Sequence, residues 1–113
     1  MTAGLPWFKF YPVAFIVGTC GLTLEERGAY ITLLAAMYDA GGAIRDSQRY
    51  ICGLLECDVR VWRRLRDRLS RLGKIIPTQD GFLTNPRMET EVTSAELTRQ
   101  VRRKSAIRGG QVT

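Results

Sequence analysis

Arginine side chains are concentrated in one short stretch of this sequence, DVRVWRRLRDRLSRLGK, at residues 58–74. The stretch holds six arginines and one lysine, and acidic residues are few within it. The planar guanidinium group can meet a phosphate, or the O6 and N7 edge of guanine, through two parallel hydrogen bonds. The chemistry that this stretch indicates is therefore the binding of a polyanion.

Groups that could carry out catalysis are scarce by comparison. The sequence has no histidine, so no imidazole can activate a thiol or complete the usual ligand set of a zinc site. It contains no GxxxxGK[ST] phosphate-binding loop. Two pairs of carboxylates fall in expected first helical turns, where the helix dipole favours acids: Glu25 with Glu26, and Glu89 with Glu91. We expect no catalytic residue, no metal and no cofactor, and hence no enzyme.

The charge is distributed unevenly along the 113 residues. Residues 1–57 contain four basic and five acidic side chains, whereas residues 58–113 contain 13 basic and six acidic ones. The second half of the chain is thus a candidate surface for a polyanion such as nucleic acid.

Cysteine usage and hydropathy indicate where the protein works. An odd number of cysteines fits reduced thiols: Cys20, Cys52 and Cys57. The longest apolar run near the N-terminus, residues 13–17, is too short to span a bilayer and lacks the flanks of a secretory signal. We expect a cytoplasmic protein with no membrane partner.

Several elements must position the arginines. Thr23 and Glu26 have the spacing of a capping box before a helix over about residues 24–40, with Gly41 at its end. Asp46 is the expected cap of a second helix ending near Leu55, and a third helix starts at Asp58.

The third helix has two unlike faces. Trp62, Leu65, Leu69 and Leu72 share a narrow apolar side, and the basic residues occupy the opposite side with Asp67 among them. Salt bridges from Asp67 to the arginines four residues away would instead suit an ordinary solvated helix, but one acid then faces several bases. The imbalance favours contact with nucleic acid.

The remaining pattern gives a fold class. Ile44 belongs to at most a very short strand, and Asp80-Gly81 forms a turn between two short apolar runs, with Pro77 confined to an edge strand. Helix, short strand, two closely joined helices and a hairpin follow one another in a winged helix-turn-helix. We predict a mainly α fold with a small β-hairpin, an N-terminal aromatic arm and a C-terminal helix.

The ends of the chain have distinct compositions. The stretch LPWFKFYP and a short helix from Pro12 to about Val17 form the aromatic arm, which we expect to lie across the core. Asn85 and Pro86 begin a last helix to about residue 105, with a thin apolar stripe and a basic tail. We assign residues 1–92 to the winged-helix domain with its arm, and residues 86–113 to the C-terminal helix and a partly disordered basic tail.

A series of motifs runs along most of the sequence: LPWFKFYP at 5–12, GT at 18–19, LTLEERGAY at 22–30, LL and MY within 33–38, GG and I within 41–44, and VWRRLRDRL and GK within 61–74. In these motifs the sequence resembles the YdaU-like family of phage and prophage proteins. The resemblance implies a winged-helix-like fold that works near phage DNA replication or its control, in the cytoplasm of a bacterial host. The family provides no catalytic residues to carry over.

Two functions remain open on these observations. The first is a non-catalytic DNA-binding protein that acts on duplex DNA in phage replication or transcriptional control. Its expected contacts are Arg60, Arg63, Arg64, Arg68, Arg71, Lys74, Arg102, Arg103 and Lys104, with the hairpin as a wing. The second is a protein-interaction module that forms a homodimer or docks on a replication protein. Its expected contacts are Trp7, Phe8, Phe10, Met88, Val92, Leu97 and Val101.

Overall fold

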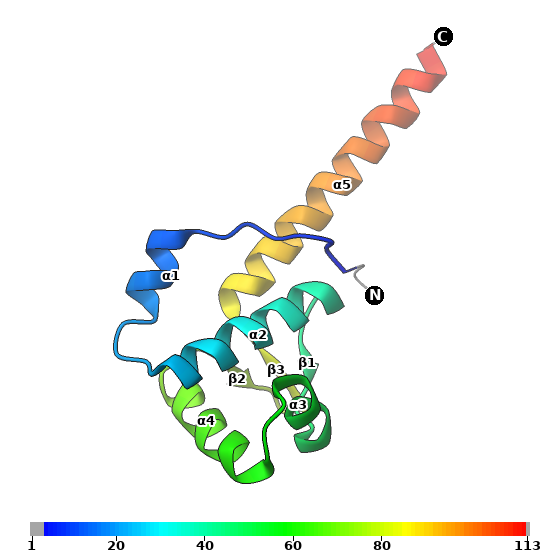
Figure 1. Ribbon diagram of the computed structural model, residues 1–113. Coiled ribbons are helices and arrows are strands. Elements are labelled where there is room, and N and C mark those ends of the chain that lie inside the picture. Colours follow the sequence, from blue (N-terminus) through cyan, green and yellow to red (C-terminus); the bar gives the residue numbers. More distant parts are fainter. Residues whose placement is uncertain (1–3, 113) are drawn as a thin grey trace.

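The computed structural model describes residues 4–112, and the side chains of residues 4–102. It is mainly helical, as the sequence predicts, and a third short strand joins the predicted hairpin in a small three-stranded antiparallel sheet (Figure 1). The elements are α1 (Pro12–Gly18), α2 (Leu24–Ala40), β1 (Ile44–Arg45), α3 (Gln48–Leu55), α4 (Val59–Arg71), β2 (Ile76–Pro77), β3 (Phe82–Thr84) and α5 (Pro86–Val112). Within residues 4–112, no helix is both long enough and apolar enough to cross a membrane.

Helix α2 lies at the centre of the fold and packs against α3, α4 and α5. The predicted capping box begins it: the Glu26 N–H donates to Thr23 Oγ1 at 3.1 Å, and the Thr23 N–H donates to Glu26 Oε1 at 2.9 Å. Gly41 ends it with a φ of 77°, which glycine adopts without strain. Leu33 and Met37 of α2 are fully buried in the core.

The sheet has the strand order β1-β3-β2, so β3 is central. Leu83 pairs with Ile44 on one side and with Pro77 on the other. Pro77 therefore lies on an edge strand, where its missing N–H costs no ladder hydrogen bond. The predicted turn joins β2 to β3, with Gly81 at a φ of 86°.

The start of α3 corrects the sequence analysis. Ser47, not Asp46, is its cap, because the Ser47 hydroxyl accepts a hydrogen bond from the Tyr50 N–H at 3.3 Å. Asp46 turns instead toward α4 and accepts two hydrogen bonds from Arg66. The two charge-assisted hydrogen bonds from Arg66 outweigh the single one that a cap would give Asp46, so the acid turns to α4.

Helix α4 follows α3 closely. Glu56 has a φ of 54° and makes the tight connection, and Asp58 caps α4 by accepting from the Val61 N–H at 2.9 Å. Leu72, expected on the apolar side, is 44% exposed. Leu72 is the C-cap, one residue beyond the end of the helix at Arg71.

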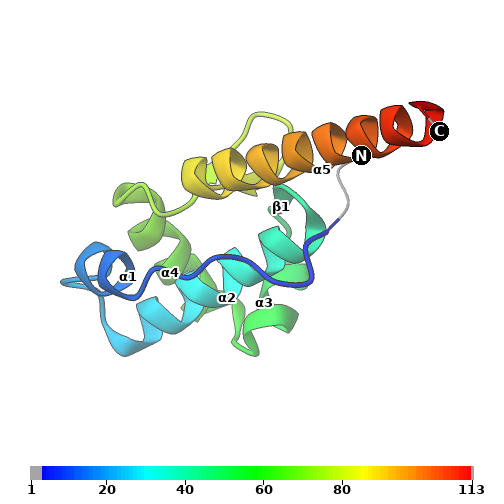
Figure 2. The ribbon, with the colours of Figure 1, turned by 90° about the horizontal axis from the view of Figure 1, so that it is seen from above.

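Helix α5 begins at the core and then leaves it. Asn85 caps it by accepting from the Met88 N–H at 3.0 Å, as predicted, and its amide also donates to the Lys74 carbonyl at 2.9 Å. Met88 and Val92 are buried against the body. Beyond them the helix projects outward to Val112, past the end near residue 105 that the sequence indicates (Figures 1 and 2).

The N-terminal arm runs over α2 toward α1 (Figure 2). The Leu5 N–H donates to the Tyr38 carbonyl at 3.0 Å, and the ring of Phe8 stacks on that of Tyr38 with 4.2 Å between centroids. Both contacts agree with an arm that lies across the core. Helix α1 follows the arm and has no buried residue.

Candidate functional site

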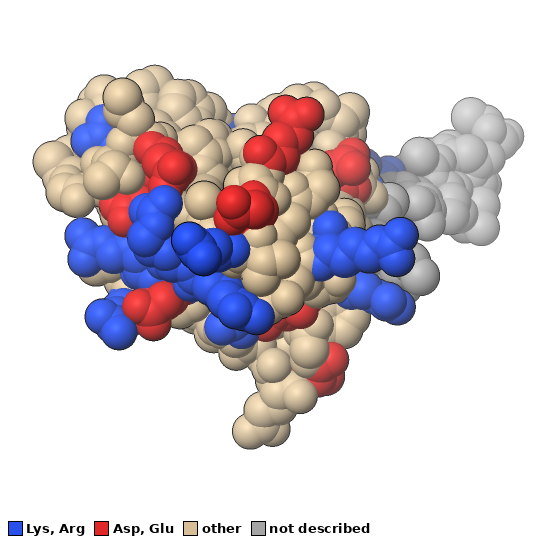
Figure 3. Space-filling view, turned by 60° about the horizontal axis from the view of Figure 1, so that its bottom comes forward, with Lys and Arg blue, Asp and Glu red and all other residues tan. Residues whose placement is uncertain are grey.

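Basic side chains gather on the face of the molecule that includes α4, with acidic side chains among and beside them (Figure 3). Trp62, Leu65 and Leu69 of α4 are at most 2% exposed, and they fix the helix against the core. The arginines of the opposite side must then point away from the core, because the two sets are out of phase along the helix. We call this side the outer face of α4: Arg60, Arg63, Arg64, Arg68 and Arg71.

Acids from α2 neutralise part of the outer face. Arg64 forms an ion pair with Glu25, and Arg68 approaches the buried Glu26 at 3.5 Å. These two glutamates belong to the first turn of α2, where the helix dipole also favours them. The pairs therefore tie α4 to the start of α2 and reduce the positive charge at one edge of the outer face.

Asp67 occupies the middle of the basic region, as the sequence indicates. It pairs with Arg71, four residues along, at 3.1 Å. Both side chains are more than half exposed, so the pair is screened by water and contributes little to stability. A competing anion such as phosphate could displace Asp67 at low cost.

Arg60 and Arg63 form no ion pair with the residues whose side chains the structure describes. Both are exposed, and they lie within one turn of each other near the start of α4. They are consequently the most available cations of the predicted site.

Lys74, predicted with these arginines, lies elsewhere. Its Nζ is 5.7 Å from the centroid of the Tyr30 ring on α2, and a Cβ added at Gly18 of α1 would come within 3.6 Å of it. The side chain thus points toward α1 and α2, into a separate pocket, and away from the outer face of α4. The glycine turn at Gly73, with a φ of 70°, reverses the chain between Arg71 and Lys74.

The predicted basic tail is partly outside the described side chains. Arg102 is exposed on the projecting part of α5, whereas the side chains of Arg103 and Lys104 lie outside the described residues. The partial disorder of the tail, and the division into residues 1–92 and 86–113, stay predictions.

The residues proposed for a protein interface differ in their exposure. Trp7, Phe10, Leu97 and Val101 are each more than half exposed and are available for contact. Met88 and Val92 are 0% and 5% exposed, which corrects their assignment to an interface: they complete the core of a single chain. Phe8 is partly covered by its stacking on Tyr38.

Cys57 has the surroundings of a weakly reactive thiol, whereas Cys20 is exposed. Partial burial and the neighbouring Cys52 raise the pKa of the Cys57 thiol, so less of it is present as the nucleophilic thiolate. Among residues 4–102, no cluster of three or more cysteine or carboxylate side chains has the arrangement of a metal site.

Sequence reasoning missed the acids that face α4. Glu25, Glu26 and Asp46 lie between 20 and 42 residues from their arginine partners in the chain, and no local pattern predicts such pairs. A capping-box glutamate gives no signal that its carboxylate also meets another helix.

Residues 6–93 match the model of a protein family described as a protein of unknown function, DUF1376. No curated protein and no solved structure matches the chain.

Proposed function

This chain belongs to the DUF1376 family of proteins of unknown function, and we propose that it is a non-catalytic DNA-binding protein that uses the outer face of α4. One observation carries the proposal: Arg60 and Arg63 are exposed and without an acidic partner among the described residues, on a helix whose other side is fixed in the core. Arginines that point outward from a helix held in the core can approach DNA without reorganisation of the fold.

The order of the elements supports a winged helix-turn-helix. Helices α3 and α4 are joined by a tight connection, a hairpin follows α4, and the strand β1 before them pairs with β3 of that hairpin. In a helix-turn-helix the second helix of the pair enters the major groove, and α4 is that helix. At 13 residues it is about 20 Å long, enough to cross a groove about 12 Å wide.

The hairpin contributes less to this proposal than α4. Its turn, residues 78–81, contains Asp80 and no basic residue. A wing without cations can follow the DNA surface but adds no attraction to phosphates. The proposed affinity therefore comes from α4, with Arg102 and the basic tail as additional phosphate contacts.

The resemblance to YdaU-like proteins supports a setting for this activity. It favours a phage or prophage protein that acts in DNA replication or transcriptional control within the cytoplasm of a bacterial host. Duplex DNA is the proposed partner, because a helix in the major groove requires one.

Fluorescence anisotropy with labelled duplex and single-stranded DNA tests the proposal. We expect the intact protein to bind duplex DNA with an affinity that falls steeply with salt, by a slope of about −0.9 per phosphate neutralised in a plot of log affinity against log salt. An unlabelled random competitor separates specific from general binding. The absence of binding at low salt would show that the outer face of α4 serves another purpose.

A protein-interaction role is the second candidate, and the exposure of the arm and of α5 favours it. A groove of about 600 Å³ lies between them, lined by Trp7, Thr98 and Arg102 among others. Leu97 and Val101 are apolar and exposed on the same helix. These surfaces would bind a second copy of the chain or a replication protein. Sedimentation at two concentrations distinguishes a self-associating chain from a strict monomer.

A further inference from the structure

A second cavity is lined by residues of α1, α2 and the start of α5. Helix α1 and the start of α5 lie on one side of α2, and α4 lies on the other (Figure 1). The volume of the cavity is about 320 Å³, at the lower end of the range of ~300–1,000 Å³ for small-molecule sites. The arm, α1, α2, the residues after α4 and the first turns of α5 all contribute to its walls. A cavity of this size suits one small ligand.

Three cations line this pocket and only one carboxylate does. The cations are Lys9 on the arm, Lys74 after α4, and Arg87 on α5; the carboxylate is that of Glu91. Neither Lys9 nor Lys74 forms an ion pair with residues 4–102. The pocket consequently has an excess of two positive charges, which favours an anionic ligand.

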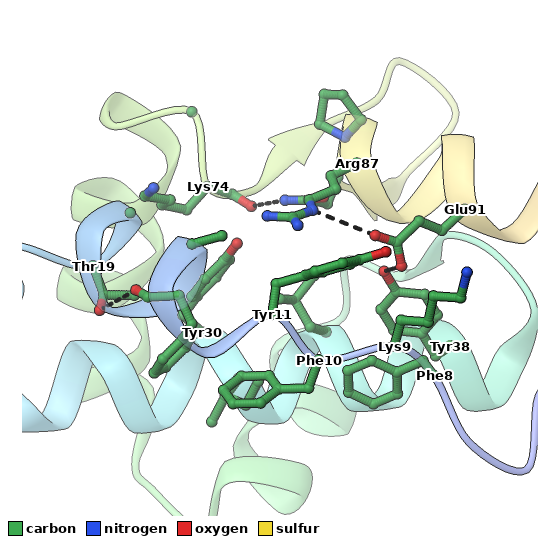
Figure 4. A pocket seen from close by; sticks show the side chains of 18 residues that line it. Phe8, Lys9, Phe10, Tyr11, Thr19, Tyr30, Tyr38, Lys74, Arg87 and Glu91 are labelled. Atoms are coloured by element: carbon green, nitrogen blue, oxygen red, sulfur yellow. Dashed lines mark hydrogen bonds and ion pairs between the residues drawn. The ribbon is translucent and has the colours of Figure 1, made fainter.

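The single carboxylate is already engaged. Glu91 Oε2 accepts a hydrogen bond from the Tyr38 hydroxyl at 2.7 Å, and Oε1 accepts one from Arg87 Nε at 3.3 Å (Figure 4). Both oxygens therefore have protein partners. Arg87 still has the two terminal nitrogens of its guanidinium group for a ligand.

Aromatic rings form much of the remaining wall. Lys74 and Arg87 lie on one side of the pocket and the rings of Phe8 and Phe10 on the other, with Tyr11 between them (Figure 4). The Arg87 guanidinium lies 4.9 Å from the Tyr11 ring centroid, and Lys74 Nζ lies 5.7 Å from that of Tyr30. Each of these two cations is thus held beside an aromatic ring.

Tyr11 and Phe10 remain about half exposed, at 46% and 54%. Their rings are held by the arm and by α1, and the Phe10 ring packs against that of Phe15 with 5.3 Å between centroids. An exposed ring next to a cation can stack on a flat heterocycle whose phosphate meets that cation. Inorganic phosphate would use the cations alone and leave the rings uncovered.

We propose that this pocket binds one nucleotide, with Lys74 and Arg87 on its 5′-phosphate and the rings of Tyr11 and Phe10 against its base. The volume of about 320 Å³ suits a single nucleotide residue. The nucleotide is either a free nucleoside 5′-monophosphate or the first residue at the 5′ end of a single strand, since both present the same base and phosphate. None of these residues belongs to the outer face of α4, so this proposal is independent of the proposed DNA binding by that face.

Isothermal titration of the intact protein with deoxyadenosine 5′-monophosphate tests it, with deoxyadenosine and inorganic phosphate as the two part-ligands. We expect each part-ligand to bind at least about tenfold more weakly than the nucleotide, since each lacks one of the two contacts. Equal affinity for the nucleotide and for inorganic phosphate would overturn the proposal, and so would the absence of nucleotide binding at millimolar concentration.

Two variants separate the two contacts. Lys74→Met keeps the aliphatic stem beside Tyr30 and removes the charge, so nucleotide affinity should fall about tenfold while the thermal unfolding curve is retained. Tyr11→Ala should weaken the binding of the nucleotide and leave the weak binding of inorganic phosphate unchanged. Arg45→Gln is the matched control, because Arg45 is an exposed cation that lines a different hollow with Tyr50 and Phe82. Unaltered nucleotide affinity in folded Lys74→Met would overturn the proposal.

Short oligonucleotides identify the source of the nucleotide. If a trinucleotide with a 5′-phosphate binds more tightly than both the mononucleotide and the same trinucleotide with a 5′-hydroxyl, the pocket is a site for strand ends. A mononucleotide that binds as tightly as the phosphorylated trinucleotide, or more tightly, assigns it to free nucleotides. Duplex binding by the outer face of α4 is measured separately, so either proposal can fail while the other stands.

Discussion

Arg66 and Asp46 are joined by a two-pronged contact: Arg66 Nε donates to Asp46 Oδ1 at 3.1 Å, and Nη2 donates to Oδ2 at 2.5 Å. The contact ties the middle of α4 to the residue that follows β1. It also raises the pKa of the Arg66 guanidinium, chiefly through the hydrogen bond to Asp46. Arg66 is thereby committed to the fold, whereas Arg60 and Arg63 of the outer face have no acidic partner among the described residues.

Asp46→Ala should lower the free energy of unfolding by about 1–2 kcal/mol, because it leaves a partly buried guanidinium without its carboxylate. Urea denaturation followed by circular dichroism measures the change. Asp67→Ala serves as the matched control, since Asp67 belongs to an exposed helical pair worth at most about 0.5 kcal/mol. Equal losses in the two variants would mean that the Arg66 contact does not hold α4 in place.

The double variant Arg60→Glu with Arg63→Glu should weaken duplex DNA binding by about tenfold or more, and should reduce the salt slope by about 2. Neither residue contacts an acid among the described residues, so the unfolding free energy should change little. Fluorescence anisotropy over a salt series measures both quantities. Arg45→Gln controls for the loss of one exposed cation. An unchanged salt slope in the double variant would mean that the DNA interface does not include the outer face of α4.

Asp67→Asn should strengthen duplex binding. The substitution removes the one acid within the outer face of α4 and releases Arg71, whose exposed pair with Asp67 is worth only a few tenths of a kcal/mol. A gain of about two- to fivefold in affinity is expected from the removal of one repulsive charge. If Asp67→Asn leaves the affinity unchanged at low salt, where screening is least, the phosphates of the DNA do not lie along this face.

The stabilising contribution of Tyr38 should be lost at high pH. Burial, and then its hydrogen bond to Glu91, raise the pKa of its hydroxyl well above the ordinary value of 10.0. The folded state therefore keeps this proton at pH values where the unfolded chain has lost it. The contribution to stability is complete below pH 10 or so and is lost as pH rises above it toward the folded pKa.

Tyr38→Phe tests this relation. The variant should flatten the decline of the unfolding free energy above pH 10 or so, as measured by urea denaturation at a series of pH values. Tyr50→Phe, at an exposed tyrosine, is the control and should leave the decline in place. Identical pH profiles for the wild type and Tyr38→Phe would contradict the assignment.

Asn85→Ala should cost about 1–2 kcal/mol of stability. Asn85 is 5% exposed; its side chain both caps α5 and donates to the Lys74 carbonyl. Loss of a cap alone costs about 0.5–2 kcal/mol, and the partly buried Lys74 carbonyl loses its donor as well. Thermal unfolding by calorimetry measures the effect. Asn85→Asp keeps the cap acceptor and loses the donor, so its stability should lie between those of the wild type and Asn85→Ala.

Local signals explain why much of the fold was predictable from the sequence. The capping box of Thr23 and Glu26, the Asp80-Gly81 turn and the Asn85 cap each depend on residues within a few positions of one another. The apolar positions of α4 also share one helical face, so its buried side follows from its periodicity.

Contacts between distant segments could not be predicted in the same way. Asp46 has the sequence environment of a helix cap, and only its approach to Arg66 in space explains its position. Lys74 continues the basic run of α4 in the sequence, yet the turn at Gly73 directs it to Tyr30. The pocket of Lys74 and Arg87 combines residues from five parts of the chain, and no spacing in the sequence links them.

The projection of α5 affects how the molecule moves through solvent. The protein extends over 62 × 31 × 23 Å, and its radius of gyration is 16.9 Å, against about 13 Å for a compact chain of this length. Such a shape has a larger Stokes radius than a sphere of equal mass. A monomer of 12.7 kDa would then elute from a sizing column ahead of a spherical standard of the same mass. Early elution is therefore a property of one chain, and light scattering is the appropriate measure of its mass.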